Sequence, residues 1–281
     1  MADRDVVVVG GGPTGCSTGV FTARYGLDTM VFDRGNAALA RAAFIENYPG
    51  FPAGIDTETL RDRLHDHVEE AGAALVSDMV ESVEETEDGF VVETQEGRTV
   101  ETRYVVAAAW YDGSYLREIL GDEAFQKHAH GGETYEHFDP EYADADGRVG
   151  VEGLYVAAPA GERNAQAIIA AGTGAHVARE LIADHRASEG YPEGVRAHYD
   201  WLRPHSEFTG DWAERERWRE WYDSETPDDA DDDRREQYID DAFATRRSPE
   251  AVADLRERAH DRLLEHIDDD RIRAYLDDEV V

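Results

Sequence analysis

The sequence has 281 residues, with 63 Asp and Glu against 28 Lys and Arg, and a formal net charge of −35. This charge excludes proteins that bind nucleic acid or anionic membranes through a basic surface, because both partners are polyanions. The length allows one large domain, or one domain with a smaller companion.

Two further features of the composition narrow the class of protein. Acidic residues are spread along the whole chain and Lys127 is the one lysine, which we interpret as adaptation to a salt-rich cytosol, where the Debye length falls to about 3 Å near 1 M salt. The one cysteine, Cys16, excludes an internal disulfide, a Cys-x-x-Cys pair and a thiolate zinc site. The first residues lack the pattern of a signal peptide, and residues 165–178 are too short to span a bilayer, so we expect a cytoplasmic protein.

The beginning of the chain predicts a nucleotide-binding β–α–β unit. Residues 6–9 are a β-branched run typical of a buried parallel strand. A glycine-rich turn follows, then a helix over 16–25 that Gly26 ends, and a second strand over 28–32. This order within about 30 residues is expected of a dinucleotide-binding fold.

The middle of the chain continues with strands and helices. Residues 57–71 predict a helix capped by Thr57, with apolar residues on one face. Further strands are expected over 74–76, 79–84, 89–94, 98–101, 104–109 and 153–157, and a helix over 164–184, whereas 111–152 is expected to be irregular.

The chain changes character near Ser188, and from there we expect acidic helices and no strands. Ser248 followed by Pro249 predicts a helix start. Trp218, Trp221 and Tyr222 share a helical face, and Trp212 lies off it. We interpret these rings as packing residues that cover apolar surface, with a lid or a dimer surface as alternatives. The acidic run 228–233 is typical of a solvated, mobile link.

The Gly10-x-Gly12-x-x-Gly15 motif carries the most specific signal. Gly10 permits the tight turn, Gly12 lets the backbone approach a pyrophosphate, and Gly15 lets the helix pack on the strand. The start of the helix offers free N–H groups to phosphates. Asp33, 18 residues after Gly15, can accept hydrogen bonds from ribose hydroxyls and disfavours NADP. The motif by itself does not separate FAD from NAD.

Other reactive residue types have simpler interpretations. We interpret Cys16 as a small residue packed between helix and strand; the alternative is a thiol whose pKa is lowered by the helix start. His65 and His67 lie two residues apart on a helix and do not face each other, so we interpret both as surface residues. His128, His130 and His137 are expected to be solvated, and we predict no metal site.

Three segments resemble the thioredoxin reductase family. They are residues 45–51 (Ile-Glu-Asn-Tyr-Pro-Gly-Phe) with the segment 54–72 after them, the strand and turn at 104–110, and residues 151–158 with the helix start at 164–174. The resemblance covers about residues 4–111 and 142–185. It implies an α/β fold: a three-layer FAD/NAD(P)-binding Rossmann-like domain with a parallel sheet over 1–187, followed by a helical module over 188–281.

The resemblance also implies FAD as the cofactor, with residues 45–51 lining the flavin side. The cofactor-binding residues that we predict are Gly10, Gly12, Pro13, Thr14, Gly15, Asp33, Arg34, Asn47, Val80, Ala108, Ala109, Ala158, Gln166 and Ala167. No catalytic residue can be named.

The sequence departs from this family in several places. A whole NADPH domain separates the two halves in the family, whereas residues 111–152 separate them here, and the redox Cys-x-x-Cys is missing. Ala158-Pro159 replaces a Gly-Asp pair, Ala165 replaces an arginine, and Trp110 replaces a glycine.

We therefore expect an FAD-binding oxidoreductase-like protein without dithiol chemistry. Electrons would come from free NAD(P)H or a ferredoxin-like protein, and the insert 111–152, with Lys127 and its histidines, would approach the flavin. We expect no nucleic-acid or membrane partner, and a homodimer stays open. The alternatives are a non-catalytic dinucleotide-binding scaffold or sensor, and an NAD- or ADP-ribose-binding enzyme on the same fold.

Overall fold

A computed structural model describes residues 2–109, 113–130, 133–139, 141–157, 166–204, 207–226 and 231–278. Trp110, Ala158, Pro159 and Ala165 lie outside these residues, as do the side chains of His128 and His130. The chain divides into two compact units, Met1–Ala183 and Asp184–Val281. Within the described ranges, no helix combines the length and the apolar character needed to cross a membrane.

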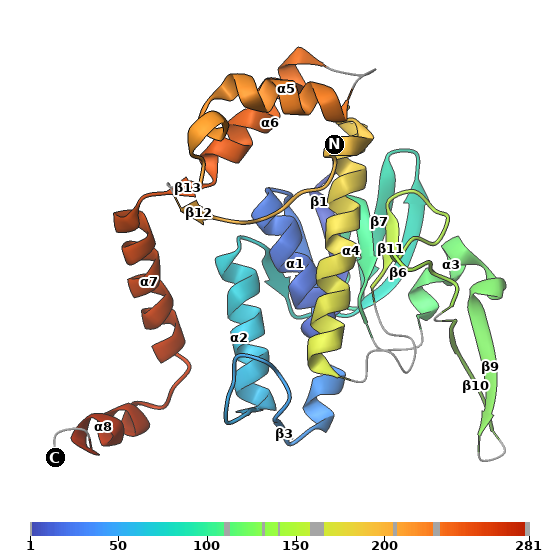
Figure 1. Ribbon diagram of the computed structural model, residues 1–281. Helices are drawn as coiled ribbons and strands as arrows, with labels where there is room; N and C mark the ends of the chain where they lie inside the picture. The colour runs from blue at the N-terminus through green and yellow to red at the C-terminus, as the bar shows by residue number, and fades with distance from the viewer. Residues whose placement is uncertain are drawn as a thin grey trace. The chain divides into compact units, whose positions relative to one another are not determined.

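The first unit is built on a mixed β-sheet, which lies beside α1 and α4 in Figure 1. Its strand order is β5-β2-β1-β8-β7-β6, and β11 pairs with β8 beside this path. The parallel strands are β1 (Arg4–Val9), β2 (Thr29–Phe32), β5 (Ala74–Val76), β8 (Thr99–Ala107) and β11 (Leu154–Val156). Strands β6 (Val80–Thr86) and β7 (Gly89–Thr94) join β8 in an antiparallel meander. The predicted α/β fold is confirmed, with a mixed sheet in place of a wholly parallel one.

Strand β8 corrects the prediction of two strands at 98–101 and 104–109. One of its edges pairs with β1 from Thr102 to Ala107. The other edge pairs first with β7, up to Thr102, and then with β11, from Val105 onward. Because β1 pairs with β8 across the point where the other edge changes partner, the polar residues at 102 and 103 do not interrupt the strand.

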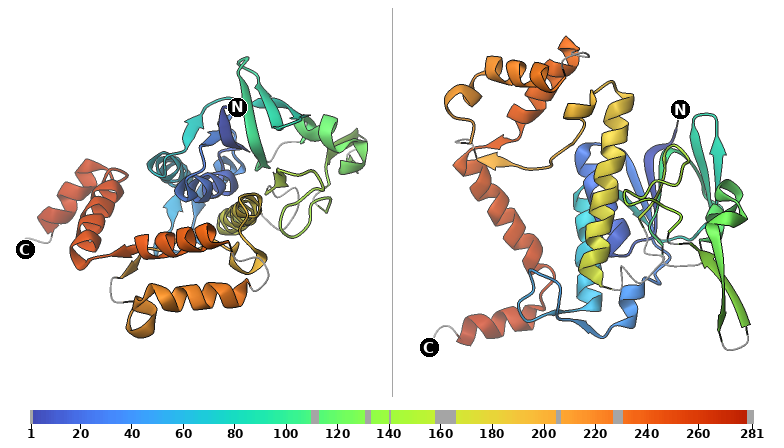
Figure 2. Two further views of the ribbon diagram at one scale, coloured as in Figure 1. Left: turned by 90° about the horizontal axis from the view of Figure 1, so that it is seen from above. Right: turned by 45° about the vertical axis from the view of Figure 1, so that its right-hand side comes forward.

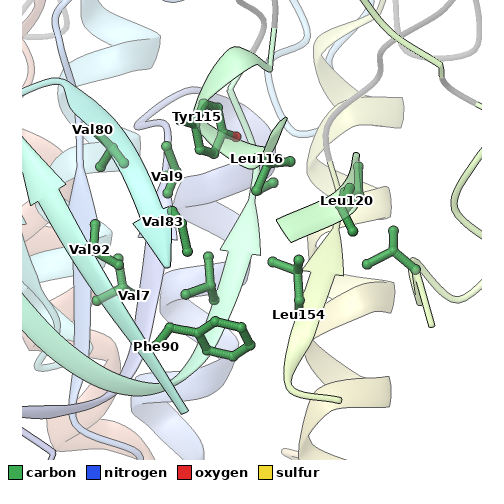
Figure 3. Packing of buried hydrophobic residues seen from close by; sticks show 14 of the residues in the cluster. Val7, Val9, Val80, Val83, Phe90, Val92, Tyr115, Leu116, Leu120 and Leu154 are labelled. Carbon is green, nitrogen blue, oxygen red and sulfur yellow. The ribbon is translucent and has the colours of Figure 1, made fainter. Parts of the chain in front are cut away.

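Both faces of β1 are buried, which explains its β-branched run. Val6 and Val8 pack against the helices α1 (Pro13–Tyr25), α2 (Thr57–Glu70) and α4 (Ala167–Ser188). Val7 and Val9 face the other way and pack with Val83 and other meander residues (Figure 3). Helices, parallel strands and meander therefore form three layers. Gly26 ends α1 in the left-handed conformation, as expected. The expected cap of α2 at Thr57 is wrong, because the Asp56 side chain caps this helix by accepting a hydrogen bond from the Thr59 N–H.

The expectation of an irregular segment over 111–152 is wrong. It contains the short helix α3 (Arg117–Leu120) and a hairpin of β9 (Phe125–His130) and β10 (Glu133–Phe138), which projects from the first unit in Figure 2. Phe125 and Phe138 are paired across the hairpin with their rings edge to face at 5.9 Å, and both are buried. This buried pair anchors a hairpin whose charged and His-rich strands gave no clear alternation. A small antiparallel pair, β3 (Phe44–Ile45) and β4 (Ile55–Asp56), precedes α2.

The second unit is mainly helical, with α5 (Arg215–Glu225), α6 (Asp232–Ala244), α7 (Pro249–Leu264) and α8 (Asp269–Asp278). Two-residue strands, β12 (Arg203–Pro204) and β13 (Arg246–Arg247), pair in parallel, so the expectation of no strands is wrong. The predicted start of α7 is confirmed, because Ser248 caps it. Asp231 caps α6, which places 231–233 at a helix start and not in a link, a position that favours acidic residues. Residues 227–230 lie outside the described ranges.

The aromatic residues of the second unit pack on one another. Tyr222 is fully buried, and the Trp221 ring lies 5.6 Å from that of Tyr238. Trp212 was expected off the shared face, but it lies in a helical turn before α5 and joins the cluster. Its ring lies 5.2 Å from the Trp218 ring, and its backbone carbonyl accepts a hydrogen bond from the Trp218 indole N–H.

Candidate functional site

A cavity of about 330 Å³ lies beside the turn between β1 and α1, at the carboxyl ends of β1 and β2. Ligands of open α/β sheets bind at this edge. The walls come from the turn at 9–14, from residues 32–34, from the loop at 36–45, and from three more distant segments at 78–80, 108–109 and 166–170. All of them belong to the first unit.

The glycines of the turn fit the roles expected of them. Gly10 has φ +118°, and a Cβ there would lie 2.6 Å from the Ala108 carbonyl oxygen. A Cβ on Gly15 would overlap the Gly10 carbonyl oxygen. A Cβ on Gly12 would meet nothing nearer than the Ala37 Cβ, at 3.7 Å. The first and third glycines are thus required by packing, whereas Gly12 leaves its side of the turn open.

Asp33 is held at the end of β2 with 9% of its surface exposed. Its Oδ1 accepts a 3.0 Å hydrogen bond from the Gly35 N–H. Its Oδ2 lies 3.5 Å from Nε2 of His65, and the same nitrogen lies 2.9 Å from the Gly11 carbonyl oxygen. The interpretation of His65 as a surface residue is therefore wrong: α2 turns this side chain toward the glycine turn.

Cys16 lies on α1 directly after the turn and is buried in the apolar core between sheet and helices. Burial, followed by the negative charge of Asp33, raises the pKa of the thiol to about 12. The Sγ–H group donates to the Gly11 carbonyl at 3.2 Å. The packing interpretation is confirmed, and the alternative of a thiol with a lowered pKa is wrong.

Asn47 and Gln166 meet across the molecule. Asn47 lies in the loop between β3 and β4, and Gln166 directly precedes α4. The Asn47 amide Nδ2 donates a 2.6 Å hydrogen bond to Gln166 Oε1. Gln166 lines the cavity and Asn47 does not, so Asn47 reaches the cavity through its partner.

The structure brings most of the predicted residues together. Those that line the cavity are Gly10, Gly12, Pro13, Thr14, Asp33, Arg34, Val80, Ala108, Ala109, Gln166 and Ala167. Gly15 packs behind the turn, and Ala158 lies outside the described residues.

Several residues that line the cavity were not predicted from the sequence. Gly11, Asn36, Ala37, Ala38, Leu39, Arg41, Asp78 and Met79 also face the cavity. The segment 36–41 could have been found, because it directly follows Asp33 at the carboxyl end of a strand. Asp78 and Met79 carry no such signal.

One group of potential metal ligands occurs among the described residues of the chain, away from this cavity. Single ligand atoms of Asp146, His176 and Glu180 lie within 4.8 Å of one another. Arg148 already forms ion pairs with both carboxylates, at 3.0 Å and 3.2 Å. We therefore interpret the group as an ion-pair network. Of the three histidines predicted in the insert, only His137 has a described side chain, and it does not belong to this group.

Comparison with known proteins relates the first unit to a family. The sequence profile of pyridine nucleotide-disulphide oxidoreductases matches residues 2–172. The chain is 34% identical over 123 residues to a thioredoxin reductase from Streptomyces clavuligerus, covering 42% of this chain and 37% of that protein. It is 35% identical over 125 residues to the bifunctional thioredoxin reductase/thioredoxin of Mycobacterium leprae, covering 42% and 27%.

A solved structure extends the comparison of the fold. The thioredoxin reductase from Gloeobacter violaceus aligns with a TM-score of 0.52 at 19% identity, covering 72% of this chain and 100% of that chain. At this identity the likeness concerns the fold alone. The chain spans between about a quarter and two fifths of the length of the curated relatives named above.

Proposed function

The chain belongs to the pyridine nucleotide-disulphide oxidoreductase family, and on this premise we propose that it binds FAD beside its glycine turn and acts as a flavin-dependent oxidoreductase. The observation that carries the proposal is the cavity at the carboxyl ends of β1 and β2, in which the side of Gly12 is open. A glycine turn that served packing alone would need Gly10 and Gly15 but not this open side.

The residues of the cavity fit the parts of a dinucleotide. The N–H groups at the start of α1 would hold the pyrophosphate, since a helix N-terminus favours anions. Asp33 would accept from the ribose hydroxyls, and its carboxylate would repel a 2′-phosphate. Gln166 and Ala167, at the start of α4, would hold the part of the cofactor farther from the adenosine. FAD, when bound, supplies hydride or electron transfer, and the protein supplies access and electrostatics.

The cysteine content supports a reaction without dithiol chemistry on this chain. Cys16 is the one cysteine of the sequence, it is buried, and its pKa is raised to about 12. A buried thiol with so high a pKa is a poor nucleophile, because the thiolate is the reactive form. Electrons would therefore enter from free NAD(P)H or from a ferredoxin-like protein, and leave to an acceptor other than a disulfide formed by this chain.

A second candidate is an NAD- or ADP-ribose-binding protein on the same fold. The glycine turn and Asp33 favour it as much as they favour FAD, because these residues recognise the ADP part that the three ligands share. The part of the ligand beyond the ADP distinguishes the two candidates.

An anaerobic absorption spectrum tests the proposal. The purified full chain, loaded with FAD in high salt, is recorded before and after addition of NADH, NADPH or reduced ferredoxin. We expect bound flavin whose visible absorbance is bleached by one of the donors. A colourless protein that takes up no FAD contradicts the proposal, and NAD identified in it by mass spectrometry supports the second candidate. Bound flavin that no donor bleaches supports a non-catalytic scaffold or sensor.

A further inference from the structure

The carbonyl oxygen of Gly11 accepts from two side chains that come from different helices. His65 Nε2, from α2, lies 2.9 Å from this oxygen, and the Cys16 thiol, from α1, donates to it at 3.2 Å. A carbonyl oxygen can only accept, so Nε2 of His65 carries the proton that points at it. Neither His65 nor Cys16 lines the cavity, whereas Gly11 and Gly12 do. The two donors therefore hold the turn from behind.

The geometry of the peptide bond gives this contact a consequence for ligand binding. A trans peptide is planar, so the carbonyl of one residue and the N–H of the next point in opposite directions. When the Gly11 carbonyl is held toward His65 and Cys16, the Gly12 N–H is directed to the other side, away from both donors. A Gly-Gly peptide has few steric restraints of its own, because glycine adopts both signs of φ with similar ease. An external restraint is thus needed to keep this N–H in one orientation.

We propose that His65 is a positioning residue for the phosphate-binding turn: by holding the Gly11 carbonyl, it directs the Gly12 N–H toward a phosphate of a bound dinucleotide. The inference rests on the proposed function, because it assumes a pyrophosphate in the cavity. The contact of His65 with Asp33 is longer, 3.5 Å, so the hydrogen bond to Gly11 is the main one. Cys16 assists from α1, and its raised pKa keeps the thiol protonated as a donor.

Variants of His65 separate this role from a merely structural one. His65→Leu removes the donor, whereas His65→Gln keeps an amide N–H that reaches a similar distance. Cys16→Ala removes the second donor to the same oxygen. His67→Leu is the matched control, because His67 is an exposed residue of the same helix. Melting temperature and circular dichroism establish that each variant is folded.

The affinities of the full-length variants for adenosine, ADP and FAD provide the readout. We expect His65→Leu to lower the affinity for ADP and FAD about tenfold, which corresponds to the loss of roughly one hydrogen bond. The affinity for adenosine should fall less than about twofold. His65→Gln should restore most of the loss, Cys16→Ala should give a smaller loss confined to the phosphorylated ligands, and His67→Leu should change nothing.

Three outcomes would overturn the inference. They are an unchanged ADP affinity in His65→Leu, an equal loss for adenosine and ADP, and a His65→Gln variant no better than His65→Leu. If His65→Leu does not fold, Cys16→Ala and His65→Gln still test the inference, because both change a hydrogen-bond donor to the Gly11 carbonyl. If the wild-type chain binds ADP but not FAD, the proposed flavin function is contradicted. The ADP affinities of the variants then still test the role of His65. A wild-type chain that binds neither overturns both.

Discussion

Asn47 and Gln166 are separated by 119 positions in the sequence, yet a 2.6 Å hydrogen bond joins their side-chain amides. The bond ties the loop between β3 and β4 to the start of α4, where Gln166 and Ala167 line the cavity. It therefore restrains Gln166, one of the residues that line the cavity.

Loss of this hydrogen bond should lower the affinity for FAD more than the affinity for ADP. We expect Asn47→Ala to weaken FAD binding by about 0.5–1.5 kcal/mol, because Gln166 loses its restraint. This range is the usual contribution of a neutral hydrogen bond. ADP, which lacks the flavin part, should bind as before. Fluorescence titration measures both affinities, and Glu46→Ala, an exposed neighbour in the same loop, is the control. An equal loss for ADP and FAD would show that the loop acts on the whole site.

Filling the open side of Gly12 should block the cofactor without unfolding the protein. A Cβ at this position meets only the Ala37 Cβ at 3.7 Å, so Gly12→Val would project its methyl groups into free space. We expect FAD binding to be lost and the melting temperature of the apoprotein to change little. Gly172→Val is the matched control, because its Cβ would meet no atom within 4 Å and Gly172 does not line the cavity. Unchanged FAD affinity in Gly12→Val would contradict the assignment of the pyrophosphate to this turn.

The carboxylate of Asp33 should contribute to binding through the ribose. We expect Asp33→Ala to weaken the binding of FAD and ADP by about 1.5–3 kcal/mol, the range for hydrogen bonds to a charged group. Calorimetric titration of both ligands measures the change. Asp28→Ala is a suitable control, because Asp28 forms an ion pair with Arg4 and does not line the cavity. A loss of the same size in both variants would point to an effect of charge at a distance.

The thiol of Cys16 should be unreactive in the folded chain. It should also lower the free energy of unfolding at high pH. Its pKa rises from 9.0 to about 12 on folding, because burial disfavours the thiolate. Its contribution to the free energy of unfolding is therefore fully present below pH 9 and is lost as the pH rises toward about 12. We expect no labelling by iodoacetamide at pH 8 until urea unfolds the chain, and a flatter alkaline stability profile in Cys16→Ala. Rapid labelling of the native protein would contradict this burial.

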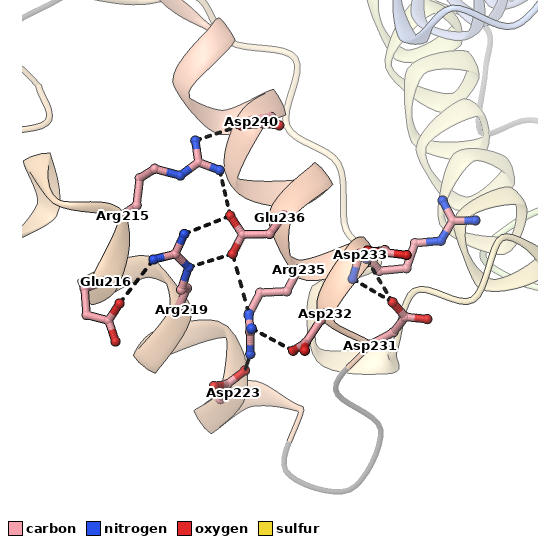
Figure 4. A network of polar contacts seen from close by, with 11 residues as sticks. Arg215, Glu216, Arg219, Asp223, Asp231, Asp232, Asp233, Arg235, Glu236 and Asp240 are labelled. Atoms are coloured by element: carbon pink, nitrogen blue, oxygen red, sulfur yellow. Dashed lines mark hydrogen bonds and ion pairs between the residues drawn. The ribbon is translucent and has the colours of Figure 1, made fainter.

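Acid should weaken the second unit through Glu236, which lies at the centre of an ion-pair network (Figure 4). Arg219 and Arg215 both donate to Glu236, and these hydrogen bonds lower its pKa from 4.5 to about 2. Because the pKa is depressed by folding, the stabilisation is present above pH 4.5 and is lost as the pH falls through about 2.

The variant Glu236→Gln should remove this acid-dependent part. Its melting temperature, measured from pH 6 to pH 2, should start lower than that of the wild type and fall less steeply. The control is Glu220→Gln, whose carboxylate makes a single exposed contact with Arg217 at 3.6 Å. Parallel profiles of wild type and Glu236→Gln would contradict the role of the network.

Residue type and spacing are sufficient to predict the segments whose partners are close along the chain. The run 6–9, the three glycines and Asp33 follow one another within a β–α–β unit, so residue type and spacing predict the turn, the helix start and the ribose acceptor. The start of α7 at Ser248 was predictable for the same reason, because a cap is a contact between near neighbours.

Contacts between distant segments could not be predicted from the sequence, because they form only in the folded chain. The packing of α2 against α1 places His65 behind the Gly11 carbonyl, although its position on the helix predicted a surface residue. The folding of the loop between β3 and β4 against α4 joins Asn47 to Gln166. The buried ring pair of Phe125 and Phe138 stabilises a hairpin whose strands show no clear alternation. In each case the deciding energy comes from side chains that meet only after the chain has folded, and no local pattern records it.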